Sequence, residues 1–210
     1  MVRPITILIA TTNRGKLREL KAILAGLPVH LTMLEDYPDL PKPIEDASTF
    51  DGNAKRKALH YAALTGCWTL ADDSGLEIDA LGGEPGVHSA RYAGPACDAA
   101  ANNARLIQKL SDMPPGRRKA RFRCVIALAS PEEVLATASG ILNGIIVDEA
   151  RGAGGFGYDP HFFVPEYGMT TAEMSPEQKN RISHRGQALR AIRPAIERLL
   201  KDSSPTALGG

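Results

Sequence analysis

The first residues suited to chemistry form a polar run between an apolar segment and an amphipathic one. The run consists of Thr11, Thr12, Asn13, Arg14, Gly15 and Lys16. A junction between a strand and a helix exposes the first backbone N–H groups of the helix, which bind anions well. The run is not a Walker A loop, because Leu17 stands where that motif needs Ser or Thr. Asn13 is also a good N-cap, so plain helix capping is the alternative to a phosphate site.

A second group is acidic. Asp72 and Asp73 are adjacent and are followed by Ser74 and Gly75. Magnesium takes oxygen ligands and keeps several waters, and a carboxylate beside a water can act as general base, an effect of about 10²–10⁴ in rate. The alternative is an acidic turn in which Gly75 adopts a positive φ. Spacing alone favours the turn, because this short pattern is not diagnostic.

A third group lies in the glycine-rich segment 152–157, which continues into Tyr158 and Asp159. Glycines let the backbone approach a flat ligand closely, and Phe156 or Tyr158 could stack on a base. A tight turn with aromatic side chains in the core is the commoner alternative.

Positive charges stand at the starts of two predicted helices. Lys16 falls in the first turn of one, and His184 and Arg185 fall in the first turn of another, with Lys179 close by in the chain. Cations at a helix N-terminus oppose the macrodipole at a cost of roughly 0.3–1 kcal/mol. A bound polyanion would make this placement favourable. Chance placement of solvated side chains is an equal alternative.

Strands and helices must position these groups, and the hydrophobic pattern predicts both. Short apolar runs predict strands over residues 5–10, 67–71, 121–129, 134–146 and 161–164. Helical periodicity predicts helices over 14–27, 49–64, 98–110 and 183–201, the last kinked or restarted at Pro194. The alternation indicates an α/β fold, and the neighbouring strands in the middle of the chain indicate a mixed sheet.

Composition limits the classes of function. The chain has 210 residues, 43% of them hydrophobic, with 25 Lys and Arg against 24 Asp and Glu. This balance argues against a protein that coats nucleic acid or an acidic membrane. We expect a single domain with two lobes over residues 1–202 and a flexible tail over 203–210. The first apolar run is too short for a signal peptide, which favours a cytoplasmic protein.

The three cysteines, Cys67, Cys97 and Cys124, form no CxxC pair. We expect reduced thiols and no zinc site. We also expect all three to be small core side chains.

Six segments together resemble the inosine-triphosphate pyrophosphatase family, most closely its bacterial XTP/dITP diphosphatases. They are ATTNRGKLREL, STFDGNAKRKA, ADDSGLEIDALGGEPGVHSARYAG, ARFRCVIALA, GGFGYDPHFFVP and KNRISHRGQAL. They stand in family order and cover the chain from Ile5 to about Leu200. The resemblance implies an elongated α/β fold with a long mixed sheet, two lobes with a nucleotide cleft between them, and a homodimer.

The resemblance also implies roles for single residues. Asp73 matches the general base, and Lys16 and Lys57 match the lysines that neutralise the triphosphate. Glu45 and Asp73 match the ligands of Mg²⁺. The implied substrate contacts are the run from Thr11 to Lys16 together with Ser74, Phe156, Gly157, Tyr158, Asp159, Lys179, His184 and Arg185.

Two positions depart from the family pattern. Thr12 replaces the usual glycine, which matters little where backbone amides do the binding. Gly52 replaces the glutamate of the usual E-N-A sequence and removes one carboxylate. If that carboxylate were a metal ligand, the affinity for magnesium would be lower here.

The activity implied by the resemblance is hydrolysis of ITP, dITP and XTP to the monophosphate and pyrophosphate. Donors from Arg185, His184 or a backbone amide would bond the 6-keto oxygen, and adenine would leave them unpaired. The implied partners are a purine nucleoside triphosphate and a second copy of the chain, with no nucleic acid and no membrane. A nucleotide monophosphatase and a non-catalytic nucleotide-binding regulator are the alternatives.

Overall fold

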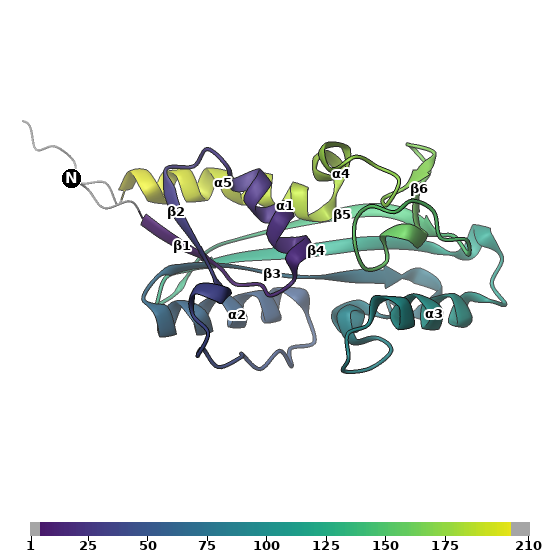
Figure 1. The fold of residues 1–210 in the computed structure, drawn as a ribbon, viewed down its shortest axis with the longest axis horizontal. Helices are drawn as coiled ribbons and strands as arrows, with labels where there is room; N and C mark the ends of the chain where they lie inside the picture. The colour runs from purple at the N-terminus through teal and green to yellow at the C-terminus, as the bar shows by residue number, and fades with distance from the viewer. Residues whose placement is uncertain (1–4, 203–210) are drawn as a thin grey trace, which may run out of the picture. The chain divides into compact units, whose positions relative to one another are not determined.

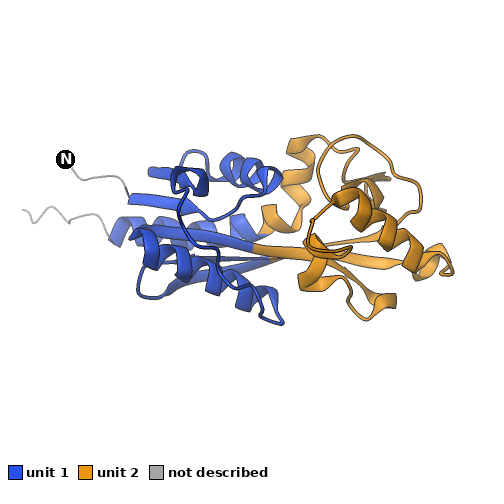
Figure 2. Ribbon diagram, turned by 60° about the horizontal axis from the view of Figure 1, so that its bottom comes forward, with its two compact units in different colours: residues 1–72, 125–139, 188–210 blue, residues 73–124, 140–187 orange. Residues whose placement is uncertain are grey.

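The computed structural model describes residues 5–202, which fall into two compact units (Figure 2). Within that range, unit 1 comprises residues 5–72, 125–139 and 188–202, and unit 2 comprises residues 73–124 and 140–187. The predicted flexible tail, 203–210, lies outside the described residues. The grouping of residues 1–202 as one domain stays a prediction.

Seven strands form one mixed sheet in the order β2-β1-β3-β4-β5-β6-β7. The strands are β1 (Ile5–Ile9), β2 (Val29–Met33), β3 (Trp68–Ile78), β4 (Lys119–Ala129), β5 (Val134–Ile146), β6 (Phe162–Val164) and β7 (Met169–Thr170). β1 pairs with β2 and β3 in parallel, whereas β6 pairs with β5 and β7 in antiparallel fashion. The predicted α/β class and mixed sheet are therefore confirmed.

Within residues 5–202, five α-helices accompany the sheet, with short 3₁₀ helices in the connections. The α-helices are α1 (Arg14–Leu24), α2 (Phe50–Thr65), α3 (Ala99–Leu110), α4 (Pro176–Ile182) and α5 (His184–Asp202). The 3₁₀ helices are Leu34–Asp36, Asp79–Leu81, Gly86–Arg91, Pro115–Arg117 and Asp159–His161.

Unit 1 is built on the parallel strands. Its central strand β1 buries three consecutive residues, Ile7, Leu8 and Ile9, each with no exposed surface. A parallel strand covered on both faces has this continuous apolar pattern. Figure 1 shows the cover, with α1 and α5 on one side of these strands and α2 on the other.

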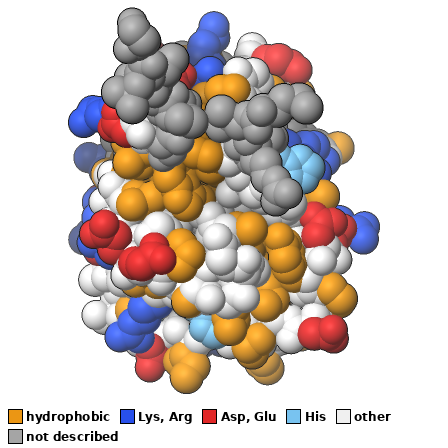
Figure 3. Space-filling view, turned by 90° about the vertical axis from the view of Figure 1, so that its left-hand side faces the viewer, with side chains coloured by type: hydrophobic (Ala, Val, Ile, Leu, Met, Phe, Trp, Pro, Cys, Tyr) orange, Lys and Arg blue, Asp and Glu red, His pale blue; other side chains and the backbone are white. Residues whose placement is uncertain are grey.

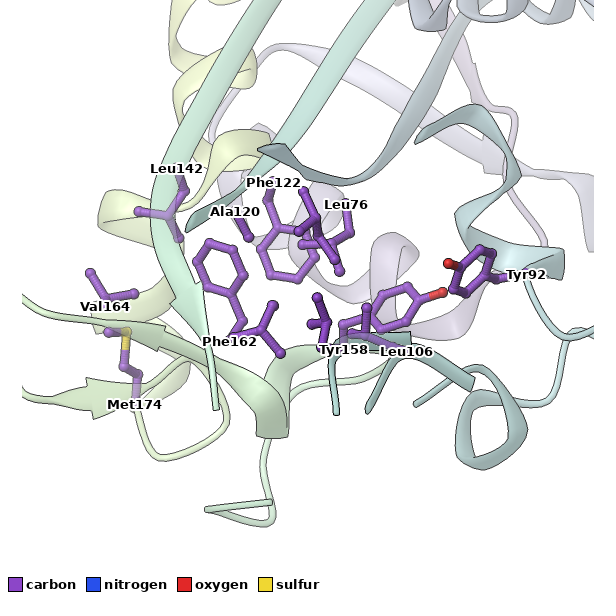
Figure 4. Close-up of a cluster of buried hydrophobic side chains, with 13 residues drawn as sticks. Leu76, Tyr92, Leu106, Ala120, Phe122, Leu142, Tyr158, Phe162, Val164 and Met174 are labelled. Atoms are coloured by element: carbon purple, nitrogen blue, oxygen red, sulfur yellow. The ribbon is translucent and has the colours of Figure 1, made fainter. Parts of the chain in front are cut away.

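Unit 2 is organised around a cluster of buried side chains (Figure 4). The rings of Phe122 and Phe162 stack at its centre with centroids 4.2 Å apart. Leu106 and Leu110 of α3 contribute to the same cluster. Figure 1 places α3 on one side of the strands of unit 2 and α4 on the other.

The predicted N-cap at Asn13 is confirmed, and two further helices begin in the same way. Asn13, Thr49 and Asp98 each cap a helix, and each accepts a hydrogen bond from a backbone N–H of the first turn. The predicted end of the first helix at Leu27 is wrong, because α1 ends at Leu24 and the chain turns at Gly26, whose φ is +85°. Glycine adopts that left-handed conformation without a steric cost, which explains the early end.

Other predictions need correction. The strand predicted over 67–71 continues as β3 to Ile78, and the pattern gave no signal for β2, α4 or β7. Cys124 is a buried core side chain, but Cys67 is only half-buried and Cys97 is exposed. Cys97 stands in a Gly- and Pro-containing connection between Gly94 and α3, so no strand or helix carries its side chain into the core.

The surface drawn in Figure 3 carries Lys and Arg side chains interspersed with Asp and Glu among hydrophobic ones. This mixture agrees with the formal net charge of +1. Attraction for a phosphate therefore has to come from a local cluster of donors. In the described part of the chain, every helix is too short or too polar to span a lipid bilayer.

Candidate functional site

The first candidate group lies at the start of α1 in unit 1. Asn13 accepts a hydrogen bond from the N–H of Lys16 at 3.1 Å, and Thr11 Oγ1 accepts one from the N–H of Asn13 at 3.2 Å. Within residues 5–202 no acceptor is found for the backbone N–H groups of Arg14 and Gly15. Thr12, Asn13 and Arg14 are exposed. Capping therefore does not exclude anion binding here, because the cap uses one N–H of the helix start and leaves two others available to a ligand.

Lys16 is held at this helix start by Asp72. The parallel register pairs Ile9 with Leu70, so Asp72 lies two residues beyond the end of β1. The Lys16 ammonium lies 2.9 Å from Asp72 Oδ2, and their side chains are 16% and 1% exposed. The carboxylate offsets the unfavourable interaction of the lysine with the helix dipole. Lys16 is therefore placed by a buried partner rather than by chance.

Lys57 of α2 extends the same group. Its ammonium donates a hydrogen bond to the backbone carbonyl of Asp72 at 3.2 Å and forms an ion pair with Glu45 at 3.0 Å. Unit 1 thus gathers two lysines and two carboxylates, whose formal charges balance. A triphosphate that displaced the carboxylates would find both ammonium groups already in place.

The acidic pair is not a turn. Asp72, Asp73, Ser74 and Gly75 all lie within β3, and Gly75 does not have a positive φ. The turn alternative is therefore wrong. Successive residues of a strand point to opposite faces, so Asp72 and Asp73 present their carboxylates to different sides. Asp73 is only 7% exposed, and burying a carboxylate is costly unless its environment favours the charge.

In unit 2 the start of α5 carries His184 and Arg185. Arg185 is 1% exposed and donates a hydrogen bond to Ser74 Oγ at 2.9 Å. The ring of His184 stacks on Phe122 with centroids 4.9 Å apart. Gly186 is needed next to them, because any side chain there would collide with the carbonyl of Asn180 at the end of α4. The alternative of solvated basic side chains is therefore wrong for His184 and Arg185, which are both buried.

Lys179 and Asp159 form a buried pair in the same unit. The Lys179 ammonium lies 2.6 Å from Asp159 Oδ2, and both side chains are less than a tenth exposed. The same carboxylate oxygen accepts the N–H of Phe156 at 2.6 Å, and Asp159 Oδ1 accepts the hydroxyl of Thr171 at 2.8 Å. Asp159 therefore fixes the glycine-rich loop and the lysine together.

The two aromatic residues of that loop have different environments. Tyr158 belongs to the core cluster and donates its hydroxyl hydrogen bond to the carbonyl of Ser89 at 2.8 Å. Burial raises the pKa of this hydroxyl far above its ordinary value, so it stays a neutral donor. The core alternative is thus confirmed for Tyr158. Phe156 is half-buried, with Lys179 at 4.7 Å and Arg185 at 5.6 Å from its ring centroid, so it is the aromatic side chain suited to stack on a base.

Replacing Tyr158 by Phe tests this assignment. The variant removes the donor to Ser89 and leaves a buried carbonyl unpaired, so the free energy of unfolding should fall by about 1–3 kcal/mol. The ring stays in place, so KM for a nucleotide should hardly change. Urea unfolding and steady-state kinetics measure the two effects. A large rise in KM with unchanged stability would instead place the hydroxyl at the substrate.

Several positioning contacts were not predicted from the sequence. Thr171 bonds Asp159, Asn103 donates to the carbonyl of Gly157 at 3.0 Å, and the amide of Asn53 bonds the backbone of Ala47. The first two contacts join residues 12 and 54 positions apart, so no local pattern could indicate them.

Among the residues that the structure describes, no group of three or more His, Cys, Asp or Glu side chains is arranged to hold a metal. Magnesium needs less from the protein, because it keeps waters and binds substrate phosphates. The carboxylates of Glu45 and Asp73 are donors of the right type, and each remains a candidate ligand by its own chemistry.

A pocket of about 300 Å³ in unit 2 contains none of the predicted site residues. Arg121 on its wall is already paired with Glu77 at 2.5 Å and Asp79 at 3.4 Å. The candidate site residues therefore do not line this pocket.

The mixed sheet and the helices that accompany it define an α/β protein. Its particular family follows from comparison with known proteins. The chain belongs to the Ham1 family, whose model matches residues 7–195. This match confirms the resemblance drawn from the six sequence segments.

Individual relatives are similar in sequence to this chain over most of their length. The dITP/XTP pyrophosphatase of Geobacter sulfurreducens is 54% identical over 187 residues, which are 89% of this chain and 94% of that protein. The protein of the same name from Desulforamulus reducens is 49% identical over 193 residues, which are 92% of this chain and 96% of that protein. A solved structure of a HAM1 protein from Coxiella burnetii has a TM-score of 0.84 at 40% identity and covers 92% of this chain and 99% of its own.

Proposed function

We propose that this chain is a nucleoside triphosphate pyrophosphohydrolase that acts on non-standard purine nucleotides. It hydrolyses ITP, dITP or XTP to the nucleoside monophosphate and pyrophosphate. Such an activity removes these nucleotides before they enter DNA or RNA. The relatives named dITP/XTP pyrophosphatase support the substrate class.

One observation carries the proposal. Lys16 stands in the first turn of α1 next to backbone N–H groups of Arg14 and Gly15 that have no acceptor within residues 5–202, and a carboxylate that is 1% exposed holds its ammonium there. A cation and free N–H groups at one helix N-terminus are the donors that a polyphosphate needs. The helix dipole disfavours a lysine at this position, and a bound polyphosphate would make the placement favourable.

The reaction is an attack of water on the α-phosphorus. The water oxygen forms a bond to the α-phosphorus, the bond to the bridging oxygen of the β-phosphate breaks, and the water proton passes to Asp73. Lys16 and Lys57 neutralise the charge on the phosphates. Phosphoryl transfer depends mainly on such positioning and charge neutralisation.

The second group of residues binds the base. Phe156 stacks on the purine, while Arg185, His184, Lys179 and Ser74 surround it. Buried donors that bond the 6-keto oxygen are left unpaired by adenine, whose 6-position carries an amino group. Asp159 holds Lys179 and the loop in place. Gly157 and the backbone of Tyr158 complete the loop.

Magnesium is the proposed cofactor, with Glu45 and Asp73 as candidate ligands. When bound, it supplies positive charge to the phosphates and orients them. We also propose a homodimer that works in the cytoplasm, and light scattering of the purified protein tests the dimer.

A panel of nucleotides with Mg²⁺ tests the function. We expect ITP, dITP and XTP to release pyrophosphate with a kcat/KM about 10²-fold or more above that of ATP. Omitting Mg²⁺ and adding a chelator should abolish turnover. Release of orthophosphate would instead identify a monophosphatase. Calorimetric binding of ITP with no product would identify a regulator, and equal rates for ITP and ATP would refute the specificity.

A further inference from the structure

The segment that carries Glu45 is bound to the first half of α2 through a side-chain amide. The N–H of Ala47 donates to Asn53 Oδ1 at 3.0 Å, and Asn53 Nδ2 donates to the carbonyl of Ala47 at 3.3 Å. Asn53 is 1% exposed. One amide therefore pairs with both polar groups of the Ala47 backbone, as a neighbouring strand would. This pairing fixes the chain two residues after Glu45.

Gly52 provides the room for this contact. A Cβ atom at Gly52 would lie 2.8 Å from the Cβ of Ala47 and 3.2 Å from Thr49 Oγ1. Gly52 does not have a positive φ, so its backbone does not require glycine. Glycine is also a poor helix former compared with alanine. In this chain residues 47–49 thus lie so close to Gly52 that a side chain at position 52 would force them to shift.

We propose that Gly52 and Asn53 are positioning residues that hold the Glu45 carboxylate against Lys57. Glycine at 52 lets the segment approach the helix, and the amide of Asn53 sets its register. Glu45 then meets the Lys57 ammonium at 3.0 Å, and Asp46 binds Arg56 beside it. A role of Glu45 in binding magnesium rests on the proposed function. The position of its carboxylate beside Lys57 does not depend on that function.

The arrangement matters because residues 37–49 contain no α-helix or strand. A carboxylate on an irregular segment loses more conformational freedom when it binds a ligand than one that is already fixed. Fixing Glu45 beforehand also fixes Lys57, whose ammonium bonds the backbone of Asp72. Gly52 and the amide of Asn53 therefore hold the pair formed by Glu45 and Lys57 in place.

The substitution Gly52→Ala separates this role from ordinary helix stability. Helix propensity alone predicts that alanine strengthens α2. We expect instead faster amide hydrogen exchange over residues 45–49, because the new methyl group displaces Ala47. The matched control is Gly116→Ala, since a Cβ at Gly116 meets nothing within 4 Å. Exchange over 45–49 that is the same in Gly52→Ala as in the control would overturn the proposal.

A second substitution provides the rescue. In the double variant Ala47→Gly/Gly52→Ala, the methyl group that would be displaced is gone, so the contact at 2.8 Å no longer exists. We expect protection of residues 45–49 to return most of the way to that of the unchanged protein. A double variant that exchanges as fast as Gly52→Ala alone would contradict the steric argument.

Kinetics and metal binding complete the test. In Gly52→Ala we expect kcat/KM for ITP to fall about 10–100-fold, as for a misplacement of about 1 Å, and the double variant to recover it. Binding of Mn²⁺, measured by electron paramagnetic resonance without nucleotide, should weaken in Gly52→Ala. If exchange changes while Mn²⁺ binding does not, the positioning role stands and the metal role of Glu45 fails.

Discussion

Replacing Asp73 by Asn is expected to lower kcat for ITP by about 10²–10⁴-fold while leaving the fold intact. The amide has the shape of the carboxylate but cannot accept the proton of the attacking water. Asp73 is 7% exposed, so the substitution also removes a buried charge and should not lower the melting temperature. Pyrophosphate release at saturating ITP and Mg²⁺, together with thermal unfolding, measures both effects.

Asp72→Asn is the matched control. Asp72 is adjacent to Asp73 on the same strand and is also buried, but its carboxylate is bound to Lys16 and points to the other face. We expect Asp72→Asn to lower stability and to raise KM, with a smaller effect on kcat. Full activity of Asp73→Asn would remove Asp73 from the mechanism. Equal losses of kcat in both variants would indicate a general disturbance of β3.

Helix starts could be predicted from the sequence because their signals are local. Asn13, Thr49 and Asp98 each have a short polar side chain that bonds an N–H two or three residues later. Such a bond needs no partner from elsewhere in the chain. The helices that begin after these residues were accordingly placed within about one residue of their observed starts.

The acidic part of β3 could not be predicted, because its conformation depends on distant residues. Asp, Ser and Gly favour turns when only neighbours are considered. In the structure Asp72 bonds Lys16, Ser74 bonds Arg185 and Glu77 bonds Arg121. These partners lie 56, 111 and 44 positions away along the chain. Tertiary contacts therefore override the local preference and keep the strand extended.

The residues of the candidate site could be predicted from the sequence, but the contacts between their side chains could not. The residue pattern singled out Lys16, and the family resemblance added Lys57 and Glu45. The structure brings all three into one polar group of unit 1 with Asp72. Tyr158 shows the limit of motif reasoning. A tyrosine in a glycine-rich loop suits base stacking as well as core packing, and only its bond to Ser89, 69 positions away, decides for the core.

The second large effect is expected for Lys16→Met. Methionine fills a similar volume without the charge, so kcat/KM for ITP should fall by about 10²–10³-fold because one triphosphate contact is lost. The variant should also lose about 3–5 kcal/mol of unfolding free energy, because Asp72 is left in a 1% exposed position without its lysine partner. Urea unfolding measures the stability, and nucleotide kinetics measure the activity.

The double variant Lys16→Met/Asp72→Asn separates the two effects. With the aspartate neutral, no buried charge lacks its counterion, so much of the lost stability should return. Activity should not return, because the ammonium that meets the phosphates is still absent. If the double variant regained activity along with stability, Lys16 would only be the counterion of Asp72. If neither returned, the contact at 2.9 Å would not be what holds these two residues in place.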